Sequence, residues 1–331
     1  MKKPKITFSG FIPAPPLLFF RMVRAMLADI PVPSRDNADF SDRAMPDTPS
    51  TARARAVLLV VAACFLLAGM DALGKHLMQH LPAAQVVWAR YSFHTLLVGL
   101  AFGLQHRHDF LRPRRPGLQL VRGLCLLGVT FGIYLAIRRI PLGDATAILF
   151  LAPILVTLLA ARLLHEAVRP LHWLALGLGL AGVLLILRPG FGRFDPVMLL
   201  PLGSALLLAF YFVLTRLLRH HDSELTTLFH TTVGGTLVMS LAIPLYWVRP
   251  APEEWPLLAL MGLMGAGGHL MLIRAFRTAG AAGLSPWLNT QILAASLYGA
   301  WLYGEPVTLP FLAGAGLIVA GGLVTWRAGR H

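Results

Sequence analysis

The distribution of apolar residues is the feature of this sequence that most limits its fold. From Ala54 onward there are ten apolar segments, each long enough, at about 17–25 residues, to cross a bilayer as a helix. The predicted spans are 54–77, 83–104, 118–137, 143–164, 171–188, 196–217, 224–247, 255–275, 282–303 and 307–326. Short connections rich in Pro and Gly separate them and leave no room for a soluble domain. We therefore expect an all-α integral membrane protein with ten transmembrane helices.

The composition of the chain supports a position within the lipid bilayer. It is 56% hydrophobic and 13% charged, whereas about a quarter of the residues are charged in ordinary soluble domains. The net charge of +14 bears on membrane orientation, because no aromatic-basic platform or zinc spacing provides a nucleic-acid-binding face. Cys64 and Cys125 lie within apolar runs and indicate neither a disulfide framework nor a metal site. We expect no nucleic-acid partner, no metal and no cofactor.

A repeated segment divides the apolar part of the chain. When Glu166 and Glu305 are aligned without gaps, the 25 residues that start at each share nine identities at a separation of 139 residues. We predict a flexible, basic, Pro-rich tail at 1–53, a first repeat with helices 1–5 at 54–190, and a second repeat with helices 6–10 and a short C-terminal tail at 191–331. Five helices separate equivalent positions, so the repeats are predicted to be inverted. Inverted repeats place a binding region near the bilayer midplane, and rocking of one half against the other exchanges its accessibility.

The basic residues predict the orientation of this helix ladder. With the N-terminus in the cytoplasm, the inner loops and the C-terminal end hold twelve Lys and Arg residues, against six at the outer ends. Both termini are therefore predicted to be cytoplasmic, in a bacterial-type inner membrane. Glu166 then lies at an inner connection and Glu305 at an outer one. Each precedes a new apolar run, where a carboxylate can accept hydrogen bonds from the free N–H groups of that helix, so we expect a structural role.

Three stretches of the sequence resemble the EamA domain of the drug/metabolite transporter superfamily. They read "MDALGKHLMQHLPAAQVVWARYSFH", "IPLGDATAILFLAPILVTLLAARLLHE" and "LSPWLNTQILAASLYGAWLYGEP". The resemblance covers about residues 54–327; Pro153 matches a proline of the family pattern, and Ile292 stands at the equivalent position of the second copy. It implies two inverted five-helix halves around a central cavity lined mostly by helices 1–4 and 6–9. Members of the family carry amino acids, amines, nucleosides, vitamins and sugars.

Charged residues at bilayer depth mark the candidate substrate site of the first half. Such groups cost about 2.5–3.5 kcal/mol on insertion scales, so those present usually face protein or water. Asp71 and Lys75 are four residues apart on the first helix, as are Arg90 and His94 on the second. We predict that Asp71, Lys75 and Arg90 meet in one cluster, which acts as an ion-pair lock or as a substrate site. His94 either packs in the core or provides proton coupling, and Asp144 is expected to cap the fourth helix.

The candidate residues of the second half are neutral. They are His230, Trp287, Asn289 and Gln291. The amides of Asn289 and Gln291 can hydrogen-bond to a polar solute, or can link helices without any substrate. Tyr134, Tyr211 and Trp287 are the aromatic candidates for stacking on a planar or cationic ligand, and simple packing is the alternative.

The remaining motifs favour a transporter over an enzyme. Gly177, Gly179 and Gly182 match a dinucleotide-binding pattern by letter, but they lie inside an apolar helix with no preceding strand, so we expect them to pack helices. Walker A, HExxH and GxSxG sequences are absent. The leading hypothesis is a secondary transporter that moves a small polar metabolite (an amino acid or amine, a vitamin or a nucleoside-like compound) by alternating access. A membrane-embedded enzyme and a ligand-binding receptor without flux are the alternatives.

Single cysteines test the predicted orientation. In a background in which Cys64 and Cys125 are replaced, Arg114→Cys is expected to react with a membrane-impermeant maleimide only after the cells are opened. Arg249→Cys, at a predicted outer end, serves as the matched control and should react in intact cells. Labelling of position 114 from outside would show that the predicted orientation is wrong.

Overall fold

The structure is a computed structural model that describes residues 50–103, 111–164, 170–187, 195–218, 221–279 and 284–328. All regular secondary structure within these ranges is helical, so the expected all-α fold is confirmed there. Five of the helices in the described ranges are long and apolar enough to cross a membrane, and further apolar helices are shorter. The predicted tail up to residue 49 and Glu166 lie outside the described residues.

The helices follow the predicted ladder closely. The first repeat contains α2 (Ser50–Leu77), α3 (Ala83–Gly103), α4 (Pro116–Ile137), α5 (Leu142–Leu149), α6 (Ala152–Leu164) and α7 (Pro170–Leu187). The second repeat contains η3 (Pro196–Met198), α8 (Leu199–Leu218), α9 (Glu224–Ala242), η4 (Ile243–Leu245), α10 (Glu254–Ala279), η5 (Ser285–Asn289), α12 (Thr290–Tyr303) and α13 (Leu309–Ala328). The first helix thus begins four residues before the predicted start of the first repeat.

Two of the predicted spans are interrupted instead of continuous. The fourth span consists of α5 and α6, which are separated at Phe150–Leu151. Pro153 explains this break, because it lacks the N–H that would continue the hydrogen-bond ladder and because it fits the first turn of a new helix. The ninth span begins with the 3₁₀ helix η5 and becomes α-helical at Thr290. This junction, Asn289–Thr290, lies 139 residues after Phe150–Leu151, so both repeats change helix geometry at equivalent positions.

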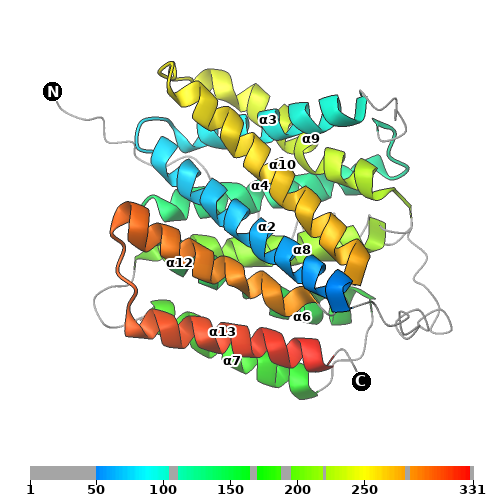
Figure 1. Cartoon of the computed structure of the whole chain (residues 1–331), viewed down its shortest axis with the longest axis vertical. Helices are drawn as coiled ribbons and strands as arrows, with labels where there is room; N and C mark the ends of the chain where they lie inside the picture. The colour runs from blue at the N-terminus through cyan, green and yellow to red at the C-terminus, as the bar shows by residue number, and fades with distance from the viewer. Residues whose placement is uncertain are drawn as a thin grey trace. The chain divides into compact units, whose positions relative to one another are not determined.

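The helices of both repeats alternate in two layers. In one layer α3, α10, α2 and α12 lie side by side, and in the other α9, α4, α8 and α6 do (Figure 1). Contacts between α3 and α9 and between α12 and α5 join the layers, and α7 packs against α13. Each layer therefore contains two spans from each repeat, and the repeats interlock instead of forming separate bundles.

Glycines bring α7 and α13 into close contact. A Cβ at Gly182 would lie 2.5 Å from the Gly314 carbonyl oxygen, and a Cβ at Gly321 would lie 2.8 Å from the Ala175 carbonyl oxygen. These two contacts exchange under the 139-residue shift, as inverted repeats require. Helix packing through Gly182 is therefore confirmed. At Gly177, by contrast, a Cβ would meet no described atom within 4 Å and would face open space.

Alanine at two positions of α7 tests this close contact. Gly182→Ala is expected to lower the melting temperature of the detergent-purified chain, because the added methyl overpacks the α7–α13 contact at a cost of about 1–3 kcal/mol. Gly177→Ala is the matched control, and it should leave stability unchanged or raise it, because alanine favours a helix and meets no neighbour. Equal melting temperatures for the two variants would contradict the packing.

Candidate functional site

An ion pair between α2 and α3 forms the centre of the candidate site. Nη1 of Arg90 lies 3.2 Å from Oδ1 of Asp71 and 3.2 Å from the hydroxyl oxygen of Tyr134 on α4. The Asp71 and Arg90 side chains are 16% and 15% exposed, so neither is completely buried. Tyr134 is fully buried. Three of the predicted site residues are thus brought together from three helices.

Aromatic and sulfur contacts surround this pair. The Arg90 guanidinium lies 5.5 Å from the centroid of the Tyr134 ring, a cation–π distance. The Tyr134 hydroxyl also lies 3.9 Å from the sulfur of Met261 on α10, which belongs to the second repeat. Gly74 permits the approach of the ring, since a Cβ there would lie 2.8 Å from the Tyr134 hydroxyl oxygen. The pair is therefore positioned where the two repeats meet.

A pair of histidines links α3 to α10. The rings of His94 and His269 have centroids 5.7 Å apart, and His94 is 3% exposed. Nε2 of His94 is buried and has no hydrogen-bond partner among the described residues. His94 is one of the predicted site residues, whereas His269 is not. The signal that could have found it is a histidine inside an apolar span at bilayer depth.

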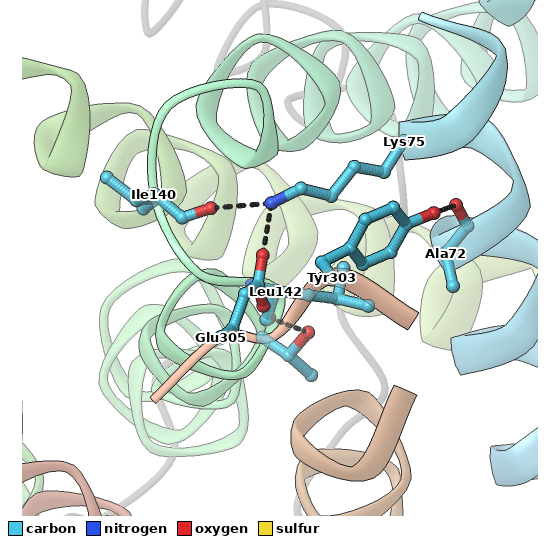
Figure 2. Close-up of polar contacts among 7 residues, drawn as sticks. Ala72, Lys75, Ile140, Leu142, Tyr303 and Glu305 are labelled. Carbon is cyan, nitrogen blue, oxygen red and sulfur yellow. Dashed lines mark hydrogen bonds and ion pairs between the residues drawn. The ribbon is translucent and has the colours of Figure 1, made fainter. Parts of the chain in front are cut away.

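Lys75 does not join Asp71 and Arg90, so the predicted three-residue cluster is wrong. Its Nζ forms an ion pair with Glu305 and donates a hydrogen bond of 3.1 Å to the carbonyl oxygen of Ile140 (Figure 2). The long, flexible stem of lysine lets the ammonium reach the end of the helix, away from Asp71. Helical spacing predicts a shared face, but it does not predict where that side chain ends.

Glu305 caps a helix of the other repeat. Its Oε2 accepts a hydrogen bond of 2.7 Å from the backbone N–H of Leu142, the first residue of α5. The prediction that it caps the following helix is wrong, because Thr308 occupies that role through a 3.4 Å bond from the N–H of Phe311. The negative carboxylate lies at the positive end of the α5 dipole and also pairs with Lys75. One side chain thus joins α2, α5 and the α12–α13 connection.

The turn after α12 places Glu305 for these contacts. Gly304 ends α12 in the left-handed conformation, with φ of 62°, which glycine adopts without steric cost. Gly299 leaves space for the Glu305 carboxylate, which a Cβ there would contact. Tyr303 donates a hydrogen bond of 2.5 Å to the carbonyl oxygen of Ala72 and anchors the same turn to α2 (Figure 2).

Asp144 lies beside this end of the molecule. It occupies the first turn of α5, where an acidic residue favours the helix dipole, but Pro141 is the N-cap residue and provides no side-chain cap. The N–H of Leu142 is satisfied by Glu305 instead. A cavity of about 170 Å³ between α5, α7 and α13 is lined in part by Asp144 and Phe311.

The other second-half candidates take separate positions. His230 bonds the carbonyl oxygen of Thr226, one turn earlier in its own helix, at 2.9 Å. Trp287 is 44% exposed, and Gln291 is half-buried. The amide nitrogen of Asn289 is directed toward α13, 3.9 Å from where a Cβ of Gly322 would be.

Tyr211 contacts a buried cation that sequence reasoning misses. Nη1 of Arg122, on α4, lies 3.2 Å from the Tyr211 hydroxyl and 3.3 Å from Oγ1 of Thr215. Nη2 donates to the carbonyl oxygen of Thr227 and to Oγ1 of Thr231. Arg122 is 1% exposed. The sequence feature that could have indicated this site is a single arginine inside the predicted apolar span 118–137.

This chain is similar to known proteins in sequence and in fold. The model of the EamA-like transporter family matches residues 54–188 and 196–327. The pseudopaline exporter CntI of Pseudomonas aeruginosa is 33% identical over 283 residues, which cover 80% of this chain and 93% of that protein. The S-adenosylmethionine uptake transporter of Rickettsia bellii is 25% identical over 250 residues, 75% of this chain and 85% of that protein. A crystal structure with 23% identity and a TM-score of 0.57 covers 83% of this chain and 97% of its own, and supports the fold.

Neutral variants test the structural role of Glu305. Glu305→Gln should destabilise the chain by about 3–5 kcal/mol, because it leaves the Lys75 charge without its acidic partner in a mostly buried site. The double variant Lys75→Met/Glu305→Gln should recover much of that loss. Thermal unfolding in detergent measures both. A Glu305→Gln chain that melts like the wild type but no longer binds substrate would assign the carboxylate to substrate binding.

Proposed function

The chain belongs to the EamA-like transporter family, and from this membership we propose that it is a secondary carrier that moves a small polar metabolite across the bacterial inner membrane by alternating access. The observation that carries the proposal is the Asp71–Arg90 ion pair beside Tyr134, at a junction of the two repeats. Both termini are cytoplasmic in this proposal.

The pair suits a solute with charged and planar groups. Asp71 offers a carboxylate to a cationic group, Arg90 offers hydrogen-bond donors to acceptor atoms of the solute, and the Tyr134 ring lies beside the guanidinium. The relative from Rickettsia bellii is named for the uptake of S-adenosylmethionine, which combines an amino-acid group with an adenine ring. This likeness favours amino-acid-type and heteroaromatic solutes as the first compounds to examine.

Alternating access needs contacts between the repeats that can break at either end. At one end, Glu305 of the second repeat bonds Lys75 and Leu142 of the first. At the other, Asp222, in the connection before α9, accepts hydrogen bonds from the N–H of Arg114 at 2.7 Å and from Gln119 at 2.9 Å. In this mechanism one carboxylate tie opens while the other holds. Proton coupling is assigned to His94 and His269, which adjoin the site between α3 and α10.

Flux through proteoliposomes tests the carrier. Purified chain is reconstituted, and the uptake of radiolabelled S-adenosylmethionine, amino acids, amines, nucleosides and riboflavin is measured, with pyranine inside the vesicles to report proton movement. Unmodified solute inside the vesicles supports a carrier. A chemically altered product without flux supports an enzyme, and binding without flux supports a receptor. Flux that moves no protons contradicts the histidine assignment.

Paired neutral variants then test the role of Asp71 and Arg90. Asp71→Asn and Arg90→Gln should each destabilise the chain, because one buried charge loses its partner, and the double variant should recover much of the stability. If the pair holds substrate, the well-folded double variant transports the identified solute with kcat/KM reduced by about tenfold or more. Gly177→Ala, which changes a residue without close neighbours, is the control for reconstitution and should transport like the wild type. A double variant with unchanged affinity and rate would show that the pair is only a structural lock.

A further inference from the structure

In the described part of the chain, Arg122 differs from the other buried cations in its lack of an acidic partner. Lys75 pairs with Glu305 and Arg90 with Asp71. Within the described residues, no carboxylate lies within ion-pair distance of Arg122, and its guanidinium is held by hydroxyl and carbonyl oxygens alone. Neutral oxygens solvate a guanidinium, but they leave its charge uncompensated in a medium of low dielectric constant. The described surroundings of Arg122 thus supply hydrogen-bond acceptors but no counter-charge.

Two buried polar atoms on α4, one of them on Arg122 itself, also lack partners in the described ranges. Nε of Arg122 and Oε1 of Gln119 have no hydrogen-bond partner among the described residues, and both side chains are 1% exposed. The two residues are three apart on α4 and so share a face. Unpartnered buried donors and acceptors are uncommon in folded proteins, because each loses its hydrogen bond to water. One atom here is a donor on a cation, and the other is a carbonyl acceptor.

An acidic residue lies beside Gln119, and an aromatic ring lies beside Arg122. Nε2 of Gln119 donates to Oδ2 of Asp222 at 2.9 Å, which places a negative charge on the Gln119 side. The guanidinium lies 5.0 Å from the ring centroid of Tyr211. A carboxylate fits the planar donor fork of arginine, and an ammonium fits an amide oxygen close to an acidic residue.

We propose that Arg122 and Gln119 form a binding position for the α-amino-acid group of the transported metabolite. The carboxylate binds the Arg122 guanidinium, and the ammonium binds Oε1 of Gln119 on the side of Asp222. In the conformation described, oxygens of Thr227 and Thr231 occupy the carboxylate's place, and the substrate replaces them when this end opens. The inference rests on the proposed carrier function and names its substrate class.

This position is distinct from the Asp71–Arg90 pair. Arg122 precedes Tyr134 by twelve residues on α4, which corresponds to about 18 Å of helical rise. It lies toward the end of α4 that is joined to Asp222, away from the end closed by Lys75 and Glu305. Substrate therefore meets Arg122 on the side predicted to be cytoplasmic.

Matched ligands test the proposal on the unaltered protein. The panel pairs L-methionine, L-arginine and L-phenylalanine with their carboxamides, and S-adenosylmethionine with its decarboxylated analogue. Affinity is measured from the ligand-dependent rise in melting temperature of the full chain. We expect at least one acid to bind about tenfold or more tightly than its carboxylate-free partner. Equal affinities within every pair would overturn the proposal.

Variants then assign the preference to Arg122. Arg122→Gln should reduce the preference for the acid to about twofold or less, and Arg122→Lys should retain part of it, since it keeps a cation. Arg112→Gln, which removes an exposed arginine from the same end of α4, should retain all of it. A folded Arg122→Gln chain with the full preference would overturn the assignment.

Different results of the flux experiment contradict the carrier function and the Arg122 site. Flux limited to solutes without a carboxylate overturns the Arg122 site and leaves the carrier standing. No flux of any labelled compound, in vesicles that contain folded protein, overturns the carrier proposal and the site with it.

Discussion

Charge inside a medium of low dielectric constant is the constraint on which the rest of this structure depends. A buried cation must find an acid, a set of neutral oxygens or a ligand, because water is not available to solvate it. Lys75 and Arg90 are neutralised by Glu305 and Asp71, and each pair connects different helices. Among the described residues, Arg122 is surrounded by neutral oxygens. The interior therefore contains three kinds of charged position: the Lys75–Glu305 pair at one end, the central Asp71–Arg90 pair, and Arg122, whose charge has no acidic partner among the described residues.

The proposed alternating access depends on the relation between the two repeats. The α7–α13 contact occurs twice, through Gly182 with Gly314 and through Gly321 with Ala175. The two contacts are equivalent, so α7 and α13 are the corresponding helices of the two repeats and pack against each other. The changes of helix geometry at Phe150–Leu151 and Asn289–Thr290 also occupy equivalent positions. A break in the regular hydrogen-bond ladder gives a helix a place to bend. In the proposed mechanism, these equivalent breaks are the places at which each repeat bends.

Sequence reasoning predicts the architecture well because it depends on local properties. Apolar length, Pro and Gly punctuation and the 139-residue repeat are sufficient to predict ten spans, their inversion and the packing role of Gly182. The site is predicted in part: Asp71, Arg90 and Tyr134 meet, whereas Lys75 reaches Glu305. Helical periodicity predicts which side chains share a face, but it does not predict the end point of a flexible stem or the helix across the repeat boundary. Arg122 and His269 are missed because their partners come from helices distant in sequence.

The two repeats contribute unequally to the interior, although they share one fold. In the described residues the buried cations Lys75, Arg90 and Arg122 all belong to the first repeat. The second repeat supplies the carboxylates that tie the ends, Glu305 and Asp222, through bonds to that first repeat. In the proposed mechanism, movement of the second repeat breaks a tie at one end without separating Asp71 from Arg90, because these two residues lie on α2 and α3 of the first repeat. In the proposed mechanism the central pair keeps its charge balance throughout such a movement, because both of its members belong to the first repeat.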